Sequence, residues 1–453
     1  MKKVLILTFL LIYSLLSFSQ EITGNWIGNL DVNGSKLEFT FNISKNDNGY
    51  ISTMGIPKQG LSNANVESTT FTDSILKISL PNFQMEYNGR LNSSNEFVGK
   101  ISQNGRPFNM ILVKGSIELN RPQEPKEPFG YYTEDIAFKN TADEVNLYGT
   151  LTLPEKNGKF PVAIIISGSG PQNRDGEMFG HKPYLVLADY LTKNGIAVLR
   201  FDERGVGKSE GDFGQTSLDQ FSADVEIAVE YLKARKEIDN KKIGLIGHSI
   251  GGIIAPKIAS ARKDIDFIVL LAAPGVDGDK LMLEQKAAKE RLMGMNEQQI
   301  MQSADGLKGA YDIIKNSEMT IEVLKDSLNN YFIAKYNGQL PENQRIGIVD
   351  QITSPEMVAI IQSKPSDYLK KLNCSVLALN GSKDFQVASK ENLLAIENAL
   401  PKNSSKKVLE LENLNHLFQE SKTGDMTEYS EIEETFSPKA LKIIAEWIKQ
   451  HTK

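Results

Sequence analysis

The sequence predicts two folded parts, a small all-β domain followed by a larger α/β domain built on a parallel sheet. Three observations predict this division. Short runs that alternate apolar and polar residues fill residues 20–118, a proline-rich stretch follows, and continuous apolar runs separated by helical stretches fill residues 132–453. Alternation with period two is typical of half-buried antiparallel strands, whereas strands that are apolar on both faces belong to a parallel sheet covered by helices.

Length and charge narrow the class of protein. A chain of 453 residues exceeds what a single hydrophobic core usually supports, so more than one domain is expected. The formal net charge is −6, and the sequence has no basic stripe with interleaved aromatic residues. We therefore expect no nucleic-acid partner.

The first residues have the pattern of a secretory signal. Lys2 and Lys3 precede an apolar run, Val4–Leu16, and small residues follow it. The alternative is a membrane anchor, but the run is shorter than the ~20 residues that a spanning helix needs. The pattern predicts a cleaved signal peptide at residues 1–19, no stable membrane span after cleavage, and export to the periplasm or the medium.

Cys374 is the only cysteine in the chain, so no internal disulfide can form. It opens an apolar run that includes Val376–Leu379, which predicts a buried, inert thiol. A cysteine nucleophile has no support from the neighbouring residues.

The alternating runs of residues 20–118 number about eight, which predicts a small barrel or a sandwich. Asn-Gly pairs between the runs, such as Asn88-Gly89 and Asn104-Gly105, predict hairpin turns. The opening Gly24-Asn25-Trp26 resembles the Gly-x-Trp start of lipocalin-like barrels over these three residues.

Residues 119–131 are predicted to be a linker, because three prolines among charged residues bar both a helix and a strand ladder. Beyond them the continuous apolar runs predict the parallel sheet. Residues 277–368 interrupt this order with helical spacing and no strand-like run, which predicts a helical insertion.

The strongest chemical signal is Gly247-His248-Ser249-Ile250-Gly251. A predicted strand leads into it and a predicted helix leaves it. A serine in such a strained strand-to-helix turn presents its hydroxyl clear of the backbone, and the flanking glycines avoid clashes in the turn. Ser249 is therefore the candidate nucleophile.

A serine hydroxyl needs a base to act as a nucleophile. His416 is our candidate, because it lies in the loop after the last predicted strand. The acid that would orient the imidazole is Asp384, which follows another predicted strand, and Asp277 and Asp279 compete with it. The chain has only three other histidines: His181, which precedes the serine motif, His248, which adjoins Ser249, and His451, near the end of the chain.

Negative charge that develops on a substrate oxygen needs backbone donors. One is expected to be the N–H of Ile250, directly after the nucleophile. The other is expected from the loop at residues 167–171, with Ser169 preferred and Gly168 as its rival. A phosphate-binding loop is the alternative for these glycines, but the Lys-Ser/Thr that should follow is missing. The charged pairs at 174–175 and within 202–209 are expected to brace the loops around the site.

These motifs together resemble the α/β-hydrolase superfamily, and within it the EstD-type bacterial serine carboxylesterases. The resemblance spans roughly residues 132–450 and excludes the N-terminal strands. The residues that carry it are Ser-Gly-Ser-Gly-Pro followed by Arg-Asp at 167–175, Asp-x-Arg-Gly-x-Gly-x-Ser at 202–209, Gly-His-Ser-Ile-Gly-Gly at 247–252, Leu-Asn-Gly-x-Lys-Asp at 379–384 and Leu-Asn-His at 414–416.

The resemblance implies an α/β-hydrolase fold with a mostly parallel eight-stranded sheet and a helical cap, which would be residues 277–368. It implies a triad in the chain order Ser249, Asp384, His416. It also implies a small-molecule ester as substrate and no cofactor. No metal site is expected, because the histidines are scattered and zinc-binding patterns are missing.

Three other functions remain open at this point. An exported serine peptidase or an acyltransferase would use the same residues. A non-catalytic protein that binds a ligand through its β domain is the third, although a complete triad argues against it.

Overall fold

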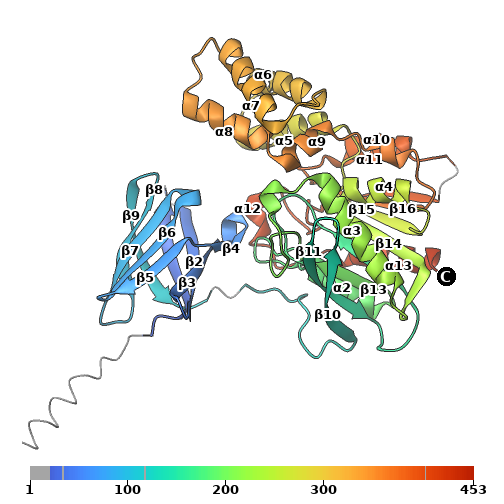
Figure 1. The fold of residues 1–453 in the computed structure, drawn as a ribbon, viewed down its shortest axis with the longest axis horizontal. Helices are drawn as coiled ribbons and strands as arrows, with labels where there is room; N and C mark the ends of the chain where they lie inside the picture. The colour runs from blue at the N-terminus through green and yellow to red at the C-terminus, as the bar shows by residue number, and fades with distance from the viewer. Residues whose placement is uncertain (1–20, 33–34, 117–118, 403–404) are drawn as a thin grey trace, which may run out of the picture. The chain divides into compact units, whose positions relative to one another are not determined.

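The computed structural model describes residues 21–453 except 33–34, 117–118 and 403–404, so the predicted signal peptide lies outside the described residues. The chain divides into two units, and the boundary along the sequence lies between Leu119 and Asn120. Each unit has its own sheet and is described separately (Figure 1).

In the described part of the first unit, nine antiparallel strands form one sheet in the order β4-β3-β2-β1-β9-β8-β7-β6-β5. Most strands pair with the next strand along the chain, and β1 also pairs with β9. The strands are β1 (Gly24–Val32), β2 (Ser35–Asn46), β3 (Gly49–Ile56), β4 (Leu61–Asn65), β5 (Ser68–Thr72), β6 (Ile75–Leu80), β7 (Met85–Leu91), β8 (Phe97–Gln103) and β9 (Arg106–Lys114).

The sheet curls until its two ends approach each other (Figure 1). Ser52 on β3 and Thr69 on β5 share a buried hydrogen bond of 2.6 Å between their hydroxyls. One face of every strand therefore turns inward, where Trp26, Phe41 and Phe97 are fully buried. The predicted all-β domain with inward-facing alternate residues is confirmed.

The predicted turn at Asn88-Gly89 is wrong, because both residues lie inside β7. Gly89 pairs directly with Gly99 on β8. A β-carbon on Gly89 would lie 2.2 Å from the hydroxyl of Tyr87, whose ring crosses the gap that the glycine leaves. This glycine serves close packing within a strand and not a turn.

In the described part of the second unit, eight strands form a sheet in the order β10-β11-β13-β12-β14-β15-β16-β17. Strand β11 runs antiparallel to both of its neighbours, β10 and β13, and the strands from β13 through β12 and β14 to β17 run parallel to one another. The strands are β10 (Tyr132–Asn140), β11 (Val145–Leu153), β12 (Phe160–Ile166), β13 (Ala197–Phe201), β14 (Ile238–His248), β15 (Phe267–Leu271), β16 (Ser375–Gly381) and β17 (Lys406–Leu411).

Helices cover both faces of this sheet, which explains why its central strands are apolar on both sides. Along β12, Ile164 packs in the cluster with α3 (Leu218–Lys233), α4 (Gly251–Ala261) and α11 (Ser389–Ala399). Its neighbour Ile165 points to the other face, toward α2 (Pro183–Lys193) and α13 (Pro438–His451).

A helical insertion separates β15 from β16, as predicted, and we call it the cap (Figure 1). It has a core of its own, which includes Ile314, Leu328 and Phe332. Its helices are α5 (Gly278–Leu292), α6 (Glu297–Lys315), α7 (Ile321–Lys335), α8 (Glu342–Ile352), α9 (Pro355–Gln362) and α10 (Ser366–Leu369).

The proline-rich stretch at residues 120–131 has no helix or strand. It belongs to the second unit and is held by hydrogen bonds to other loops of that unit. The guanidinium of Arg121 donates to four backbone oxygens of that unit, those of Phe179, Gly180, Ser430 and Ile432. Its several donors in a fixed fork suit this bridging of two loops.

Candidate active site

Ser249 lies in the sharp turn between β14 and α4, and its φ of 53° is in the left-handed region. The turn is possible only because the residues two positions before and after Ser249 lack side chains. A β-carbon on Gly247 would lie 2.2 Å from the backbone oxygen of Gly251, and one on Gly251 would lie 2.4 Å from that of Ile166. Both contacts are forbidden, so the glycines of the motif are required by geometry.

The structure brings His416 and Asp384 together. Nδ1 of His416 lies 2.8 Å from Oδ2 of Asp384, and both residues are about 5% exposed. The other carboxylate oxygen, Oδ1, accepts hydrogen bonds from the backbone N–H groups of Gln386 and Val387, each 2.9 Å long. The carboxylate is thus fixed on both sides, and the imidazole keeps Nε2 for chemistry.

The loop that bears His416, residues 413–416, is called the histidine loop below. Asn415, which is fully buried, shapes it by accepting hydrogen bonds on Oδ1 from the N–H groups of Leu417 and Gln419. The histidine loop touches the serine turn. The ring centroids of His416 and His248 are 4.9 Å apart, and His248 directly precedes Ser249.

The rival candidates are engaged elsewhere. Asp277 and Asp279 both bind Lys315, where the cap begins. His181 is buried between Thr435 and the backbone oxygen of Tyr429.

The loop at residues 167–171, here called the glycine loop, lies directly against the serine. A β-carbon on Gly168 would be 3.1 Å from the β-carbon of Ser249. The N–H of Gly168 donates to the hydroxyl of Tyr184 at 3.2 Å, and the N–H of Gly170 donates to Glu356 at 3.1 Å. Of the two predicted donors in this loop, Ser169 is therefore the one whose N–H is not committed to either of these side chains.

Glu203 is a buried acid beneath the glycine loop. Its two carboxyl oxygens contact the hydroxyl of Ser167 at 2.5 Å and the N–H of Gln172 at 2.9 Å. Burial, together with the nearby acids Glu356 and Asp224, raises the pKa of Glu203 to about 8. The group holds the base of the loop and favours its neutral form below that pH.

Charged pairs brace the surrounding turns. Arg174 contacts both oxygens of the buried Asp202, at 3.1 and 2.8 Å. Arg204 makes a similar pair with Asp224, at 2.5 and 2.7 Å. These two-pronged contacts fix the loops after β12 and β13, the two loops from which the sequence predicted such pairs.

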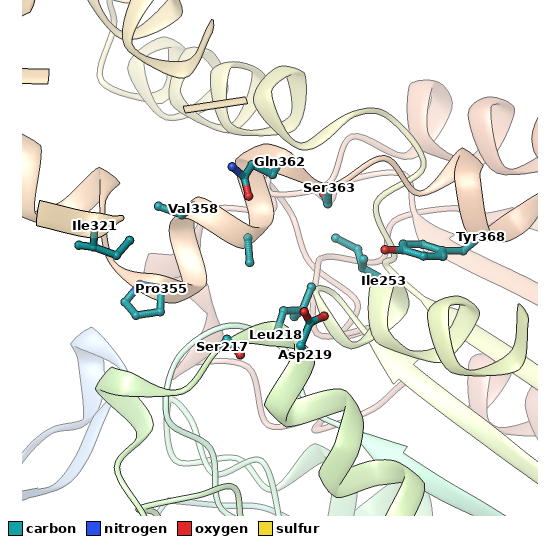
Figure 2. Close-up of a pocket in the computed structure, with 11 residues that line it drawn as sticks. Ser217, Leu218, Asp219, Ile253, Ile321, Pro355, Val358, Gln362, Ser363 and Tyr368 are labelled. Carbon is teal, nitrogen blue, oxygen red and sulfur yellow. The ribbon is translucent and has the colours of Figure 1, made fainter. Parts of the chain in front are cut away.

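A cleft of about 430 Å³ lies between the cap and the body of the second unit (Figure 2). Helix α9 forms one wall, and the start of α3 and Ile253 form the opposite one. Ile253 lies in the first turn of α4, the helix that follows Ser249. The residues that line the cleft are Ser217, Leu218, Asp219, Ile253, Ile321, Pro355, Val358, Ala359, Gln362, Ser363 and Tyr368.

Three further questions about the described residues concern metal ligands, membrane helices and the cysteine. Within residues 21–453, apart from the gaps given above, no cluster of three or more His, Cys, Asp or Glu is placed to hold a metal ion. In the same part of the chain no helix combines the length and apolar character needed to cross a bilayer. Cys374 is half-buried, and burial raises the pKa of its thiol to about 12.

Two residues at the site were missed by the sequence analysis. Tyr184 comes from α2, outside every motif, and its only signal is an aromatic residue in a helix after the glycine loop. Glu356 comes from the cap, where acidic residues are frequent and none stands out.

The sheet order, the serine turn after β14, the His416–Asp384 pair and the helical cap together give the second unit the α/β-hydrolase fold.

Parts of the chain are similar to known proteins. A family described as serine aminopeptidase, S33, matches residues 181–329. Esterase EstD from Thermotoga maritima is 26% identical over 288 residues, which cover 63% of this chain and 61% of EstD. An acyl transferase from Shewanella hanedai is 33% identical over 126 residues, 28% of this chain and 37% of that protein. Among solved structures, the Pyrococcus furiosus esterase PF2001 covers 75% of this chain and 100% of its own, at a TM-score of 0.44 and 18% identity.

Proposed function

We propose that the protein is a serine esterase that cleaves carboxylic esters through an acyl-enzyme intermediate. The observation that carries this proposal is the pairing of His416 with Asp384 beside a serine held in the left-handed region. Its similarity to esterase EstD favours an ester over other acyl substrates. The predicted signal peptide favours action outside the cytoplasm, in the periplasm or the medium.

The proposed cycle assigns one role to each of these groups. Nε2 of His416 takes the proton of Ser249 as its Oγ attacks the ester carbonyl. The N–H groups of Ile250 and Ser169 stabilise the resulting oxyanion, and His416 then protonates the leaving alcohol. Water repeats the sequence on the acyl-enzyme, releasing the acid and restoring the serine. Asp384 holds the imidazole in the required tautomer and stabilises its charged form.

The cleft beside α9 is suited to the apolar part of the ester. Its walls combine aliphatic residues such as Ile253 and Val358 with a few polar groups, as in many small-molecule sites. Helix α9 also carries Glu356, whose carboxylate touches the glycine loop. Helix α9 therefore contributes both to the wall of the cleft and to a contact with the glycine loop.

The test is a p-nitrophenyl ester series assayed beside amino-acyl p-nitroanilides, with Ser249→Ala as the inactive control. Ester turnover that disappears in the variant, with the anilides untouched, supports the esterase. Equal inactivity of both proteins on every substrate overturns the catalytic proposal and directs attention to ligand binding by the first unit.

Two related activities have specific support, one separated by the same assay and the other by product analysis. The family match over residues 181–329 favours a peptidase, which would cleave the anilides in a Ser249-dependent way. The similarity to an acyl transferase favours transfer to an added alcohol, which product analysis detects as a new ester.

A further inference from the structure

A continuous path of hydrogen bonds joins the glycine loop to the histidine loop beneath the serine turn. The N–H of Gly168 lies 3.2 Å from the hydroxyl oxygen of Tyr184. That hydroxyl lies 3.1 Å from Nδ1 of His248, and Nε2 of His248 lies 3.0 Å from the backbone oxygen of His416. Two side chains thus span the distance between the two loops that supply the proposed donors and base.

The direction of every hydrogen bond in this path is determined by its ends. A backbone N–H can only donate and a backbone carbonyl can only accept. His248 must therefore carry its proton on Nε2, where it donates to His416. Nδ1 is then an acceptor, so the hydroxyl of Tyr184 donates to it while accepting from Gly168. One tautomer and one hydroxyl orientation satisfy all three contacts.

The side chains along this path are buried, so water does not compete for their hydrogen bonds. Tyr184 is 3% exposed and His248 is 5% exposed. Burial and the neighbouring His416 lower the pKa of His248 to about 3, and burial raises the pKa of Tyr184. Both groups keep the protonation that the path requires over the whole range in which a hydrolase of this kind works.

We propose that Tyr184 and His248 are positioning residues that set the spacing and orientation of the glycine loop relative to His416. The inference rests on the proposed function. Tyr184 engages the N–H of Gly168, so of the two predicted oxyanion donors in this loop the N–H of Ser169 is the one that remains available. By donating to the backbone oxygen of His416, His248 fixes the position of the His416 imidazole relative to the serine turn.

This role acts on the transition state more than on substrate binding. The oxyanion forms only when the serine attacks, so a displaced glycine loop lowers kcat while leaving KM nearly unchanged. Misplacement by a fraction of an ångström to one ångström lowers rates by about 10- to 100-fold.

The main variant is Tyr184→Phe, which removes one hydroxyl and keeps the ring. We expect kcat on a p-nitrophenyl ester to fall about 10- to 100-fold with KM changed by less than about threefold. The control is Tyr87→Phe in the first unit, which also removes a buried tyrosine hydroxyl, one that donates to the backbone oxygen of Phe97 at 2.9 Å. It should lose stability without this loss of kcat.

A second readout reports the oxyanion itself. Oγ of Ser249 adds to the carbonyl carbon of a trifluoromethyl ketone as the serine proton moves to His416. The electron pair of the carbonyl double bond moves to the oxygen, which becomes an oxyanion for the proposed backbone donors to stabilise. We expect Tyr184→Phe to weaken inhibition by this ketone in parallel with kcat, while inhibition by an unreactive alcohol analogue stays the same. A merely structural loss would weaken both.

His248 provides a graded test. His248→Gln retains a side-chain N–H that can reach the carbonyl of His416, whereas His248→Leu has none, so glutamine should recover part of the activity that leucine loses. In the double variant with Tyr184→Phe, the losses should be less than multiplicative, because either change breaks the same path.

Rates are referred to active sites counted with a fluorophosphonate, so that partly folded preparations still give kcat per competent site. Wild-type kcat and ketone inhibition in Tyr184→Phe, with Ser249→Ala inactive, would overturn the inference and leave the esterase intact. Activity that persists in Ser249→Ala would instead overturn the proposed function.

Discussion

The carboxylate of Glu356 accepts a hydrogen bond of 3.1 Å from the N–H of Gly170, which joins cap helix α9 to the glycine loop. This contact couples the position of the cap to the loop that lies against Ser249. Partial burial raises the pKa of Glu356, and the hydrogen bond from Gly170 acts in the opposite direction.

The first prediction concerns this contact. Glu356→Ala removes the acceptor and should lower kcat/KM about five- to tenfold, equivalent to the roughly 1 kcal/mol of one hydrogen bond. Glu356→Gln keeps a carbonyl oxygen and should retain most of the activity. The control is Glu342→Ala on α8, whose side chain is about 80% exposed. Equal losses for the alanine and glutamine variants would show that charge matters there and not the contact with Gly170.

The second prediction concerns the acid beside His416. Asp384→Asn keeps the side-chain shape but removes the charge and presents an amide to Nδ1, so kcat should fall about 10³- to 10⁴-fold. Asp277→Asn is the matched control, because Asp277 is the competing acid in the sequence and is bound to Lys315. A large loss in the control and a small one in Asp384→Asn would reverse the assignment.

The third prediction is the effect of pH on stability through Glu203, whose folded-state pKa is raised from 4.5 to about 8. The folded protein holds this proton when the unfolded chain has lost it, so the contribution to stability is complete below pH 4.5. It is lost as pH rises toward 8, by up to about 1.4 kcal/mol per pH unit, and the curve levels above that.

Thermal unfolding from pH 5 to pH 9 tests this expectation. Glu203→Gln cannot ionise, so its melting temperature should match that of the wild type near pH 5 and exceed it increasingly toward pH 8. Parallel curves for the two proteins would mean that Glu203 is ionised in the folded state throughout this range.

The sequence was most informative where chemistry depends on neighbouring residues. The serine turn could be predicted because its glycines are required within five positions, and β14 and α4 follow from their apolar runs. His416 could be proposed because the chain offers only four histidines. The parallel sheet and the helical insertion between its strands followed from the same periodicity.

Contacts between distant segments could not be predicted in this way. Tyr184 meets His248 across 64 positions, and Glu356 meets Gly170 across 186. Neither pair leaves a local pattern, because each is created by the packing of a helix against the ends of strands. The turn predicted at Asn88-Gly89 was wrong for a related reason. Its glycine accommodates the ring of Tyr87 inside a strand, which turn statistics do not consider.

The fourth prediction concerns substrate length and the cleft beside α9. Ala359 lines the cleft, so Ala359→Trp should fill part of its volume of about 430 Å³. Each methylene that can no longer be buried costs about 0.8 kcal/mol, or roughly fourfold in kcat/KM. Acetate esters should therefore be cleaved normally while octanoate esters lose on the order of tenfold or more.

A tryptophan elsewhere on the cap provides the control for this experiment. Ala334 is exposed on α7 and does not line the cleft, so Ala334→Trp should leave the whole ester series unchanged. If Ala359→Trp lowered the rates of all esters by the same factor, the substitution would act on the cap or the reaction centre and not on the binding of the acyl chain of the ester. Unchanged octanoate turnover would mean that the apolar part of the ester lies outside this cleft.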